Sequence, residues 1–381
     1  MTPGTGKPEK LHVLIVGGGV AAVETVLALQ DLTAERVSMT VLAPNAELVY
    51  RPMTVREPFA YSTAARYPLA SIVADAGAEL IADKLGWVEP EKRLVHTEQG
   101  TEIGYDALVL TPGAKLHPRF EHAVTIDDRQ MDETLHGLIQ DIEQGYLKSL
   151  AFVAPGRLAW PLPLYELALM TAGRAYDMSM SLEATIITPE EKPLAVFGQE
   201  VSDGLAGLLA DKGIDFVTGY AEIHEPGEIT INPGDRRLRA GRVIALPELY
   251  GPSIRGLQAS ENGFVRVDQF GRVPHAGPVF AAGDAVDFPV KQGGVSCQQA
   301  DVVAESIAKL AGVDIDPQAF NPQIHGVLLT DGKPRYIAAK ITGGHGFASQ
   351  FSDRPIDGVT KKIAGRYLTP YLERLDAKVS A

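Results

Sequence analysis

Cysteine is almost absent from this sequence of 381 residues, in which Cys297 is the only one. A single cysteine excludes an intramolecular disulfide, a CxxC redox pair and a cysteine-rich metal site, and we predict no bound metal. We expect Cys297 to be a small, partly buried helix residue, because a nucleophilic role requires a lowered pKa. Any redox chemistry must therefore be carried by a cofactor or by another molecule.

Long apolar runs and an excess of positive charge are also missing. No run approaches the roughly 20 residues that span a bilayer, and the polar start MTPGTGKPEK lacks the apolar core of a signal peptide. The 35 Lys and Arg residues against 48 Asp and Glu residues give a net charge of −13, which argues against a nucleic-acid partner. We therefore expect a cytoplasmic protein, long enough for two domains with good cores.

The stretch LHVLIVGGGVAAVETVLALQD at residues 11–31 organises the chain. Its apolar run at residues 11–16 is typical of a buried parallel strand, and the pattern changes to helical spacing after three glycines. The turn fits G-x-G-x-x-A, which lets a pyrophosphate approach the backbone N–H groups at a helix N-terminus. The residues expected to border the phosphates are Gly17, Gly19, Val20, Ala21 and Ala22. The alternative is a tight strand-to-helix turn without a ligand, as in any α/β domain.

The acidic residue that usually binds the ribose after the second strand is missing. The strand expected at residues 38–42 is followed by Ala43, Pro44 and Asn45, so Asn45 or the more distant Glu47 would take that contact. The next 25 or so residues are rich in proline and aromatics without a clear period, which is typical of a functional irregular segment. Within it, Arg51 and its neighbours either line a cofactor or belong to a surface loop.

A second strand–helix unit opens at Ser149 without a glycine turn. Its strand at residues 150–154 is followed by PGRLAWPLPLY and by a helix expected over 166–175. Trp160 and the prolines occupy or rigidify the space that a nicotinamide nucleotide needs, so strong NAD(P)H binding is not expected. The remaining elements of this unit are a strand at 183–188, a helix at 199–212 and a strand at 215–217.

The rest of the chain alternates short strands with one clear helix. We expect a β-meander from strands at 80–86, 92–98 and 102–103, then apolar strands at 105–110, 242–246 and 277–282, and a helix at 295–310. The strand at 242–246 leads back towards the first unit. Asp284 follows a parallel strand, where an acid accepts hydrogen bonds from sugar hydroxyls; the alternative is a helix N-cap.

Three separated motifs precede a helix that carries two glutamines: GGGVAA, YDALVLTPGA and VFAAGDAVDF. Their order and spacing are similar to those of a known family. Over almost the whole chain they resemble the two-dinucleotide-binding-domain flavoproteins, which are pyridine nucleotide-disulfide oxidoreductase-like. The chain looks most like the branch of sulfide:quinone oxidoreductase, flavocytochrome c sulfide dehydrogenase and type II NADH dehydrogenase. The resemblance implies FAD as the cofactor and an α/β fold of two interleaved Rossmann-like domains with a small C-terminal segment.

The resemblance also implies domain boundaries and roles for single residues. The implied parts are 1–115 and 242–318 for the FAD-binding domain, 116–241 for an NAD(P)-binding-like domain with a degenerate glycine motif, and 319–381 for the C-terminal segment. By position, Gly17, Gly19 and Ala22 would hold the FAD pyrophosphate, Thr111 and Gly113 would border the adenosine side, and Asp284 would bind the ribityl chain. The cofactor-binding set is completed by Val20, Ala21, Asn45, Arg51 and Gly283.

The segment VSCQQA at residues 295–300 resembles the glutamine pair beside the flavin and quinone in type II NADH dehydrogenases. A helix N-terminus aimed at the flavin would stabilise the anion that forms on reduction. We therefore place Lys291, Gln298 and Gln299 nearest the isoalloxazine as catalytic residues. The alternative is that these are polar residues on an exposed first turn.

Two departures from the sulfide-oxidising members change the expected chemistry. Their C-P-P-x-P-Y-E loop matches WPLPLYE at residues 160–166, where Trp160 replaces the cysteine, and their second cysteine, expected near residues 326–328, is also absent. Sulfide oxidation through a protein disulfide or persulfide is therefore not expected. The missing second glycine motif also weakens the NADH dehydrogenase interpretation.

Together these patterns predict an FAD-dependent oxidoreductase that passes electrons from a small-molecule donor to a quinone or quinone-like acceptor. The alternative is a non-catalytic FAD-binding protein that acts as a redox sensor or a protein-interaction module. The tail at residues 357–381 predicts a single basic amphipathic helix. Such a helix packs on its own domain or on the second subunit of a homodimer, or it lies on a membrane as a peripheral contact.

Overall fold

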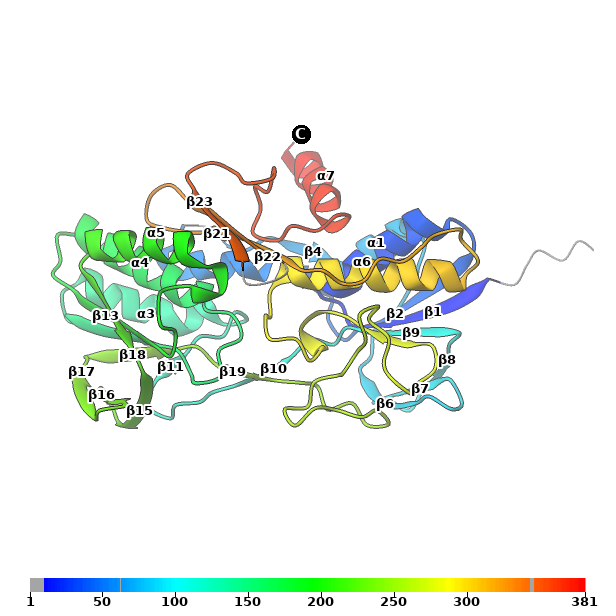
Figure 1. The fold of residues 1–381 in the computed structure, drawn as a ribbon, viewed down its shortest axis with the longest axis horizontal. Coiled ribbons are helices and arrows are strands. Elements are labelled where there is room, and N and C mark those ends of the chain that lie inside the picture. Colours follow the sequence, from blue (N-terminus) through cyan, green and yellow to red (C-terminus); the bar gives the residue numbers. More distant parts are fainter. Residues whose placement is uncertain (1–9, 62, 343–345, 381) are drawn as a thin grey trace, which may run out of the picture.

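Two five-stranded parallel sheets form the framework of the molecule, at opposite ends of its long axis (Figure 1). The computed structural model describes residues 10–61, 63–342 and 346–380, so most of the expected polar N-terminal arm lies outside the described residues. The sheets have the strand orders β20-β9-β1-β2-β5 and β11-β18-β12-β13-β14. The expected α/β class with two Rossmann-like units is confirmed.

Helices and small antiparallel sheets complete the two units. The first unit contains β1 (Leu11–Val16), α1 (Val20–Thr33), β2 (Val37–Leu42), α2 (Leu69–Asp75), β5 (Glu79–Ile81), β9 (Ala107–Leu110), β20 (Val279–Ala281) and α6 (Gly293–Leu310). The second contains β11 (Val124–Thr125), α3 (Met131–Glu143), β12 (Ser149–Val153), α4 (Leu162–Asp177), β13 (Glu183–Thr188), α5 (Gln199–Asp211), β14 (Ile214–Thr218) and β18 (Arg242–Ala245). One three-stranded antiparallel sheet accompanies each unit: β6 (Leu85–Glu89), β7 (Leu94–Thr97) and β8 (Glu102–Gly104) in the first, and β15 (Tyr220–Glu225), β16 (Glu228–Asn232) and β17 (Arg236–Arg239) in the second.

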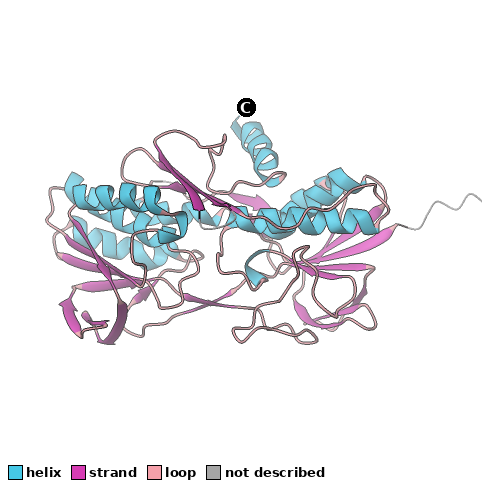
Figure 2. Cartoon of the chain, in the orientation of Figure 1, coloured by secondary structure: helices cyan, strands magenta, loops and turns pink. Residues whose placement is uncertain are grey.

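Side chains of each central strand alternate between two apolar layers, as the period of a strand requires. In β1, Val13 and Ile15 pack among α1 and α6, whereas Leu14 and Val16 pack among β6, β7 and β8. The second sheet repeats this arrangement, with Phe152 towards the helices and Val153 towards β15 and β16. Figure 2 shows the helices gathered along one side of the molecule and most of the strands along the other.

The chain crosses between the units twice, and the crossing segments pair with each other. The antiparallel strands β10 (Lys115–His117) and β19 (Glu248–Tyr250) form this link. The strand β18, at residues 242–245, pairs with β11 on one side and β12 on the other, so it belongs to the second sheet. The chain returns to the first unit only after this strand. We therefore propose that the second part of the first unit begins after β18 rather than at residue 242.

Three segments differ from the sequence-based expectations. The irregular stretch after β2 contains β3 (Glu47–Val49), the 3₁₀ segment η1 (Arg51–Phe59) and β4 (Arg66–Pro68). The strand expected at residues 80–86 is two strands, because β5 joins the parallel sheet and β6 begins the meander. The helix α4 begins four residues earlier than expected, since prolines are accepted in a first helical turn.

The C-terminal region is a small sheet, a strap and a helix. The sheet contains β21 (Gln323–Leu328), β22 (Arg335–Thr342) and β23 (Gly346–Ser352). The single helix expected from residue 357 was wrong in extent, since α7 spans Leu368–Ser380. The preceding residues, 353–367, form an irregular strap that is held by side chains of α1 and α4. Among the described residues, none of the helices is long and apolar enough to cross a bilayer.

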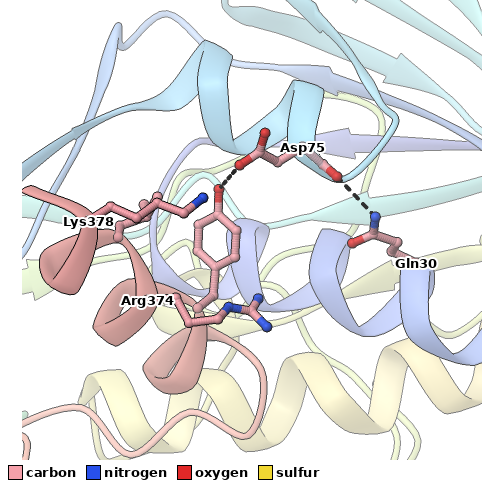
Figure 3. A pocket seen from close by; sticks show the side chains of 6 residues that line it. Gln30, Asp75, Arg374 and Lys378 are labelled. Atoms are coloured by element: carbon pink, nitrogen blue, oxygen red, sulfur yellow. Dashed lines mark hydrogen bonds between the residues drawn. The ribbon is translucent and has the colours of Figure 1, made fainter.

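The helix α7 packs on the first unit through its apolar side, one of the alternatives expected for an amphipathic helix. Leu368, Tyr371 and Leu372 are buried in the core that contains α1 and α6. Beside this contact, a cavity of about 370 Å³ is lined by residues of α7, α1 and α2. There the Tyr371 hydroxyl donates to Asp75 at 2.8 Å, and the Gln30 amide donates to the carbonyl of Asp75 at 3.0 Å (Figure 3). The apolar side of α7 is therefore occupied within this chain.

Candidate functional site

The turn between β1 and α1 leaves a helix N-terminus open. Gly17 has a φ of +127°, and a Cβ there would lie 2.3 Å from the carbonyl oxygen of Thr111, so only glycine fits. A Cβ on Gly19, the N-cap of α1, would meet no heavy atom of the described residues within 4 Å. No described side chain caps this helix. The first N–H groups of α1 therefore face open space with the positive end of the helix dipole, which suits an anionic group.

The carboxyl ends of β9 and β20 lie at the same edge of the sheet as this turn. The backbone N–H and the hydroxyl of Thr111, which follows β9, both donate to the carbonyl of Val16 at 2.8 Å. A Cβ on Gly283 would lie 2.9 Å from the Cβ of Ala21, so the end of β20 packs on the start of α1. The sheet therefore brings the glycine turn, Thr111 and Asp284 together. Together they fit a dinucleotide cofactor such as FAD.

Asp284 is the centre of a group of charged side chains. It lies in the 3₁₀ segment η3 (Gly283–Ala285), where burial raises its pKa and the nearby Asp128 raises it further, while Lys291 and Arg51 oppose that rise. Burial lowers the pKa of Lys291 to about 8, against the attraction of Asp284 and Asp287. The Lys291 ammonium donates to the carbonyl of Val286. Charged groups of both signs thus lie around Asp284 in a partly dehydrated environment.

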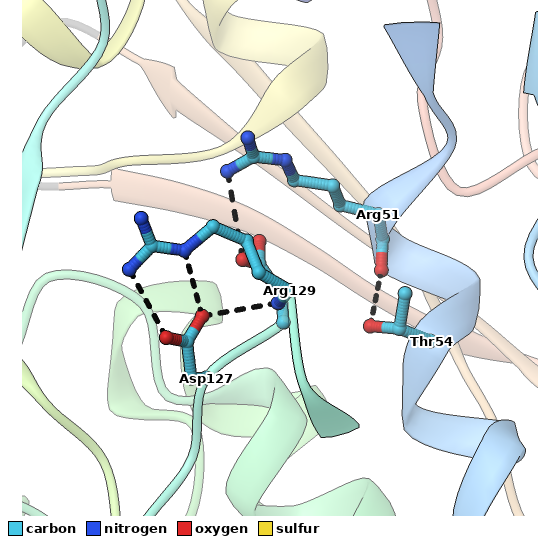
Figure 4. A network of polar contacts seen from close by, with 5 residues as sticks. Arg51, Thr54, Asp127 and Arg129 are labelled. Carbon is cyan, nitrogen blue, oxygen red and sulfur yellow. Dashed lines mark hydrogen bonds and ion pairs between the residues drawn. The ribbon is translucent and has the colours of Figure 1, made fainter. Parts of the chain in front are cut away.

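The second unit contributes Asp128 to this group of charges. Asp128 follows β11 and accepts from the Arg51 guanidinium of η1 at 3.5 Å, so this pair joins the two units (Figure 4). Burial raises the pKa of Asp128, and Arg51 opposes the rise. Asp127 beside it binds the Arg129 guanidinium with two bonds of 3.0 Å. Sequence reasoning missed Asp128 because β11 has only two residues and gives no periodic signal.

The two glutamines of the expected pair have different hydrogen-bond partners. The Gln299 carbonyl oxygen accepts from the Gly283 N–H at 2.8 Å, beside Asp284. The Gln298 amide donates to the carbonyls of Gly294 and Gln323, and its oxygen accepts from the Gln323 N–H at 2.9 Å. Gln298 therefore ties α6 to β21 through one donor and its oxygen, both bound to Gln323, while its other donor stays within α6; Gln299 holds the loop that carries Asp284.

The start of α6 is capped and covered by residues that the sequence did not single out. The Gln292 carbonyl oxygen caps α6 by accepting from the Val295 N–H at 2.9 Å. A Cβ on Gly293 would lie 2.8 Å from Ile363 of the strap, so the strap covers this turn. Of the other expected residues, Asn45 is exposed after β2, and Gly113 has a φ of +78° with open space around it.

Neither of the expected cysteine positions of the sulfide-oxidising relatives carries a thiol, and Phe197 lies between them. The Trp160 ring lies 5.7 Å from the Phe197 ring, and a Cβ on Gly326 would lie 3.3 Å from the same ring. Cys297 is buried on α6 beside Glu24, and burial raises its pKa well above the usual value. In the part of the chain that the structure describes, no cluster of His, Cys, Asp and Glu suits a metal ion.

The first turn of the second unit has no open helix N-terminus. Pro161 is the N-cap of α4 and Pro163 follows at the second helical position, where it has no N–H. The Leu164 N–H donates to the carbonyl of Pro161 at 3.0 Å. Glu190, after β13, has the place of a ribose-binding acid, but its carboxylate accepts from the Tyr165 hydroxyl at 2.6 Å and from the Ala195 N–H at 3.1 Å. The dinucleotide contacts of this unit are therefore replaced by internal ones.

Comparison with known proteins gives relatives over most of the chain. No protein-family model matches the chain. A sulfide-quinone reductase from Aquifex aeolicus is 22% identical over 355 residues, covering 84% of this chain and 81% of that protein. A solved structure of the sulfide:quinone oxidoreductase from the same bacterium has a TM-score of 0.81 at 20% identity and covers 91% of this chain and 87% of its own. A ferredoxin reductase from Rhodopseudomonas palustris has a TM-score of 0.65 at 18% identity and covers 86% and 82%.

These comparisons confirm the expected resemblance. The sulfide-quinone reductase and ferredoxin reductase relatives are FAD-binding flavoproteins, and the named relatives are oxidoreductases. They support an FAD-dependent oxidoreductase on a fold with two dinucleotide-binding units. The relatives and structural neighbours of this chain are thus pyridine nucleotide-disulfide oxidoreductase-like flavoproteins with two dinucleotide-binding domains.

Proposed function

We propose that this chain binds FAD without a covalent bond and passes electrons from a small-molecule donor to a quinone or quinone-like acceptor. The observation that carries the proposal is the open N-terminus of α1 at the same sheet edge as Asp284. FAD, when bound, supplies the two-electron chemistry that the side chains of this chain lack. A quinone acceptor is supported by the name of the sulfide-quinone reductase relative.

The chain's own residues have separate tasks in this proposal. The N–H groups of Gly19 to Ala22 bind the pyrophosphate, with Gly17 and Thr111 shaping the turn. The Asp284 carboxylate accepts hydrogen bonds from ribityl hydroxyls, and Gly283 and Gly113 let the backbone approach. Asn45 would contact the ribose, and the Arg51–Asp128 pair places one charge of each sign near Asp284.

Lys291 and Gln299 are the residues that we propose nearest the reacting ring system. The Lys291 ammonium is buried, so a positive charge there acts in a region of low dielectric and stabilises negative charge nearby. The Gln299 oxygen is used by Gly283, which directs its amide group as a donor. Gln298 is better described as a positioning residue, because both of its donors bind backbone carbonyls.

The donor must deliver its electrons to the cofactor directly. The protein supplies no dithiol for sulfide oxidation, since Trp160 stands at the first expected cysteine position and residues 326–328, near the second, include no cysteine. The proline-capped start of α4 also weakens NADH as the donor. A homodimer and a peripheral membrane contact stay predictions; α7 offers its polar side, with Arg374 and Lys378, because its apolar side is buried.

The proposal is tested by anaerobic stopped-flow spectroscopy of the purified protein. We expect a yellow protein that releases FAD on denaturation and, once reduced, is reoxidised by a soluble quinone. Lys291→Met should slow reoxidation by about tenfold or more at unchanged FAD content, whereas Lys309→Met, at the far end of α6, should leave the rate unchanged. An FAD-loaded protein that no soluble quinone reoxidises would contradict the acceptor proposed here.

A further inference from the structure

A second cavity, of about 300 Å³, lies between the two units. One wall is the loop after β12, with Ala159 and Pro161, and a second wall is Val196 in the 3₁₀ segment η2 (Ala195–Phe197). Pro289 and Val290, on the segment that leads into α6, form the third. The volume is at the lower end of the range for small-molecule sites. The function proposed above does not use this cavity.

The walls of the cavity offer almost no charge to a ligand. Glu190 is the only ionisable residue among those that line it. Its carboxylate is already bound by Tyr165, Thr188 and the Ala195 N–H, and burial raises its pKa. Lysine and arginine do not line the cavity. An anionic ligand would therefore leave water without a compensating partner, which is costly.

At the start of α4, beside the cavity, the N–H groups that hold a pyrophosphate in a dinucleotide site are missing or used. Pro161 and Pro163 have no N–H, and the Leu164 N–H is used by the carbonyl of Pro161. The cavity is nevertheless close to the candidate site, because the Lys291 N–H donates to the carbonyl of Ala159 at 3.3 Å. The cavity residue Val290 is thus followed directly by Lys291, whose charge interacts with Asp284.

We infer that this cavity binds a small, uncharged and largely apolar molecule, and that it does not bind a nicotinamide dinucleotide. The apolar walls favour such a ligand through the burial of its surface. A role for the bound molecule in electron transfer rests on the proposed function, whereas its binding does not.

The test measures binding by the fluorescence of Trp160, which lies between the cavity residues Ala159 and Pro161 in the sequence. The chain has two tryptophans, so Trp87→Phe leaves Trp160 as the only reporter. The probes are 1,4-naphthoquinone and its 2-sulfonate, which has the same rings and one negative charge, together with NADH. We expect saturable quenching by naphthoquinone and at least tenfold weaker binding of the sulfonate and of NADH.

Two variants locate the binding, and a third is their control. Val196→Phe and Val290→Phe fill the cavity and should weaken naphthoquinone binding at least tenfold, whereas Val313→Phe, half-buried beyond α6, should not change it. Equal binding of the sulfonate, tighter binding of NADH, or unchanged binding in both cavity variants would overturn the inference. FAD released from the same samples separates the proposals. Quenching without FAD would overturn only the proposed function, and FAD without quenching would overturn only this inference.

Discussion

The two strand–helix units begin their first helices in opposite ways. In the first unit, the N-cap Gly19 leaves the N–H groups of α1 open, with no described neighbour near its Cβ position. In the second unit, Pro161 and Pro163 remove donors from the start of α4, and Glu190 is bound internally. Both units have a five-stranded parallel sheet covered by helices, in which four strands follow the same order and only the edge strand β20 or β11 differs in its place in the chain, so the fold is separable from the binding chemistry. That chemistry depends on a few residues at one turn.

The units also share a feature that their turns do not reveal. Glu24 and Glu166 are each the fifth residue of their helix, α1 or α4, and both side chains are fully buried. Glu24 accepts from the N–H groups of Tyr367 and Leu368 at 2.9 and 2.6 Å. Glu166 accepts from the Lys362 ammonium at 2.7 Å. The strap and the first residue of α7 therefore fasten both units through matching positions.

The largest expected effect comes from exchanging glycine for alanine in each turn. Gly17→Ala should abolish FAD binding and most folded protein, because its Cβ would overlap the Thr111 carbonyl at a positive φ. Gly156→Ala, in the turn of the second unit, should keep FAD, because its Cβ would meet only the Tyr220 ring at 3.3 Å. Cofactor absorbance and circular dichroism of the two variants make the comparison. Equal FAD content in the two variants would contradict the claim that only the turn of the first unit binds the cofactor.

A smaller effect should follow from breaking the buried ion pair of the second unit. Lys362→Met leaves the Glu166 carboxylate buried and unpaired, which should lower the free energy of unfolding by about 3–5 kcal/mol. Urea denaturation at neutral pH measures the change. The double variant Lys362→Met with Glu166→Gln should recover most of the loss, because it leaves no buried charge. A single variant as stable as the parent would show that the strap does not fasten this unit.

In the first unit, Glu24, which corresponds to Glu166, lies beside Asp301. We expect this contact to make the free energy of unfolding depend on pH. Burial and Glu24 raise the pKa of Asp301 to about 8, with Glu305 adding to the rise and Arg366 opposing it. The folded state then holds a proton that the unfolded state releases near pH 4. Its stabilisation is complete below that pH and is lost as the pH rises towards 8. Between pH 6 and 8 we expect a loss of about 2 kcal/mol.

The control for this pH dependence is Asp301→Asn, which cannot ionise. Urea denaturation of both proteins at a series of pH values should show a falling free energy of unfolding in the parent and a flatter curve in the variant. Identical slopes in the two proteins would assign the pH dependence to other groups.

The smallest expected effect concerns the prolines of α4. Pro163→Ala restores one N–H at the helix start, and a single donor near a helix dipole is worth about 0.3–1 kcal/mol. NADH affinity should therefore rise less than about fivefold, as measured by calorimetric titration. A rise of a hundredfold would mean that one proline alone separates the second unit from a dinucleotide site.

The sequence predicted those parts of the site that depend on local pattern. The glycine turn and Asp284 lie next to apolar strands, so the ends of strands and the starts of helices are enough to locate them. Arg51 and Asp128 are 77 residues apart, and their contact depends on how the two units dock. Gln298 looked equivalent to Gln299 in the sequence, but β21 approaches α6 so that only Gln298 binds the backbone of Gln323. Contacts between distant elements were therefore the part that could not be predicted.

The most direct test of the central claim is the FAD content of the native protein beside that of Gly19→Val. The position has open space and a φ of −92°, so valine should let the chain fold while it fills the space for the pyrophosphate, and the variant should melt like the native protein stripped of FAD. We predict one FAD per chain in the native protein and none in the variant. A folded native protein that binds no FAD, or a variant that keeps its full FAD content, would contradict the account.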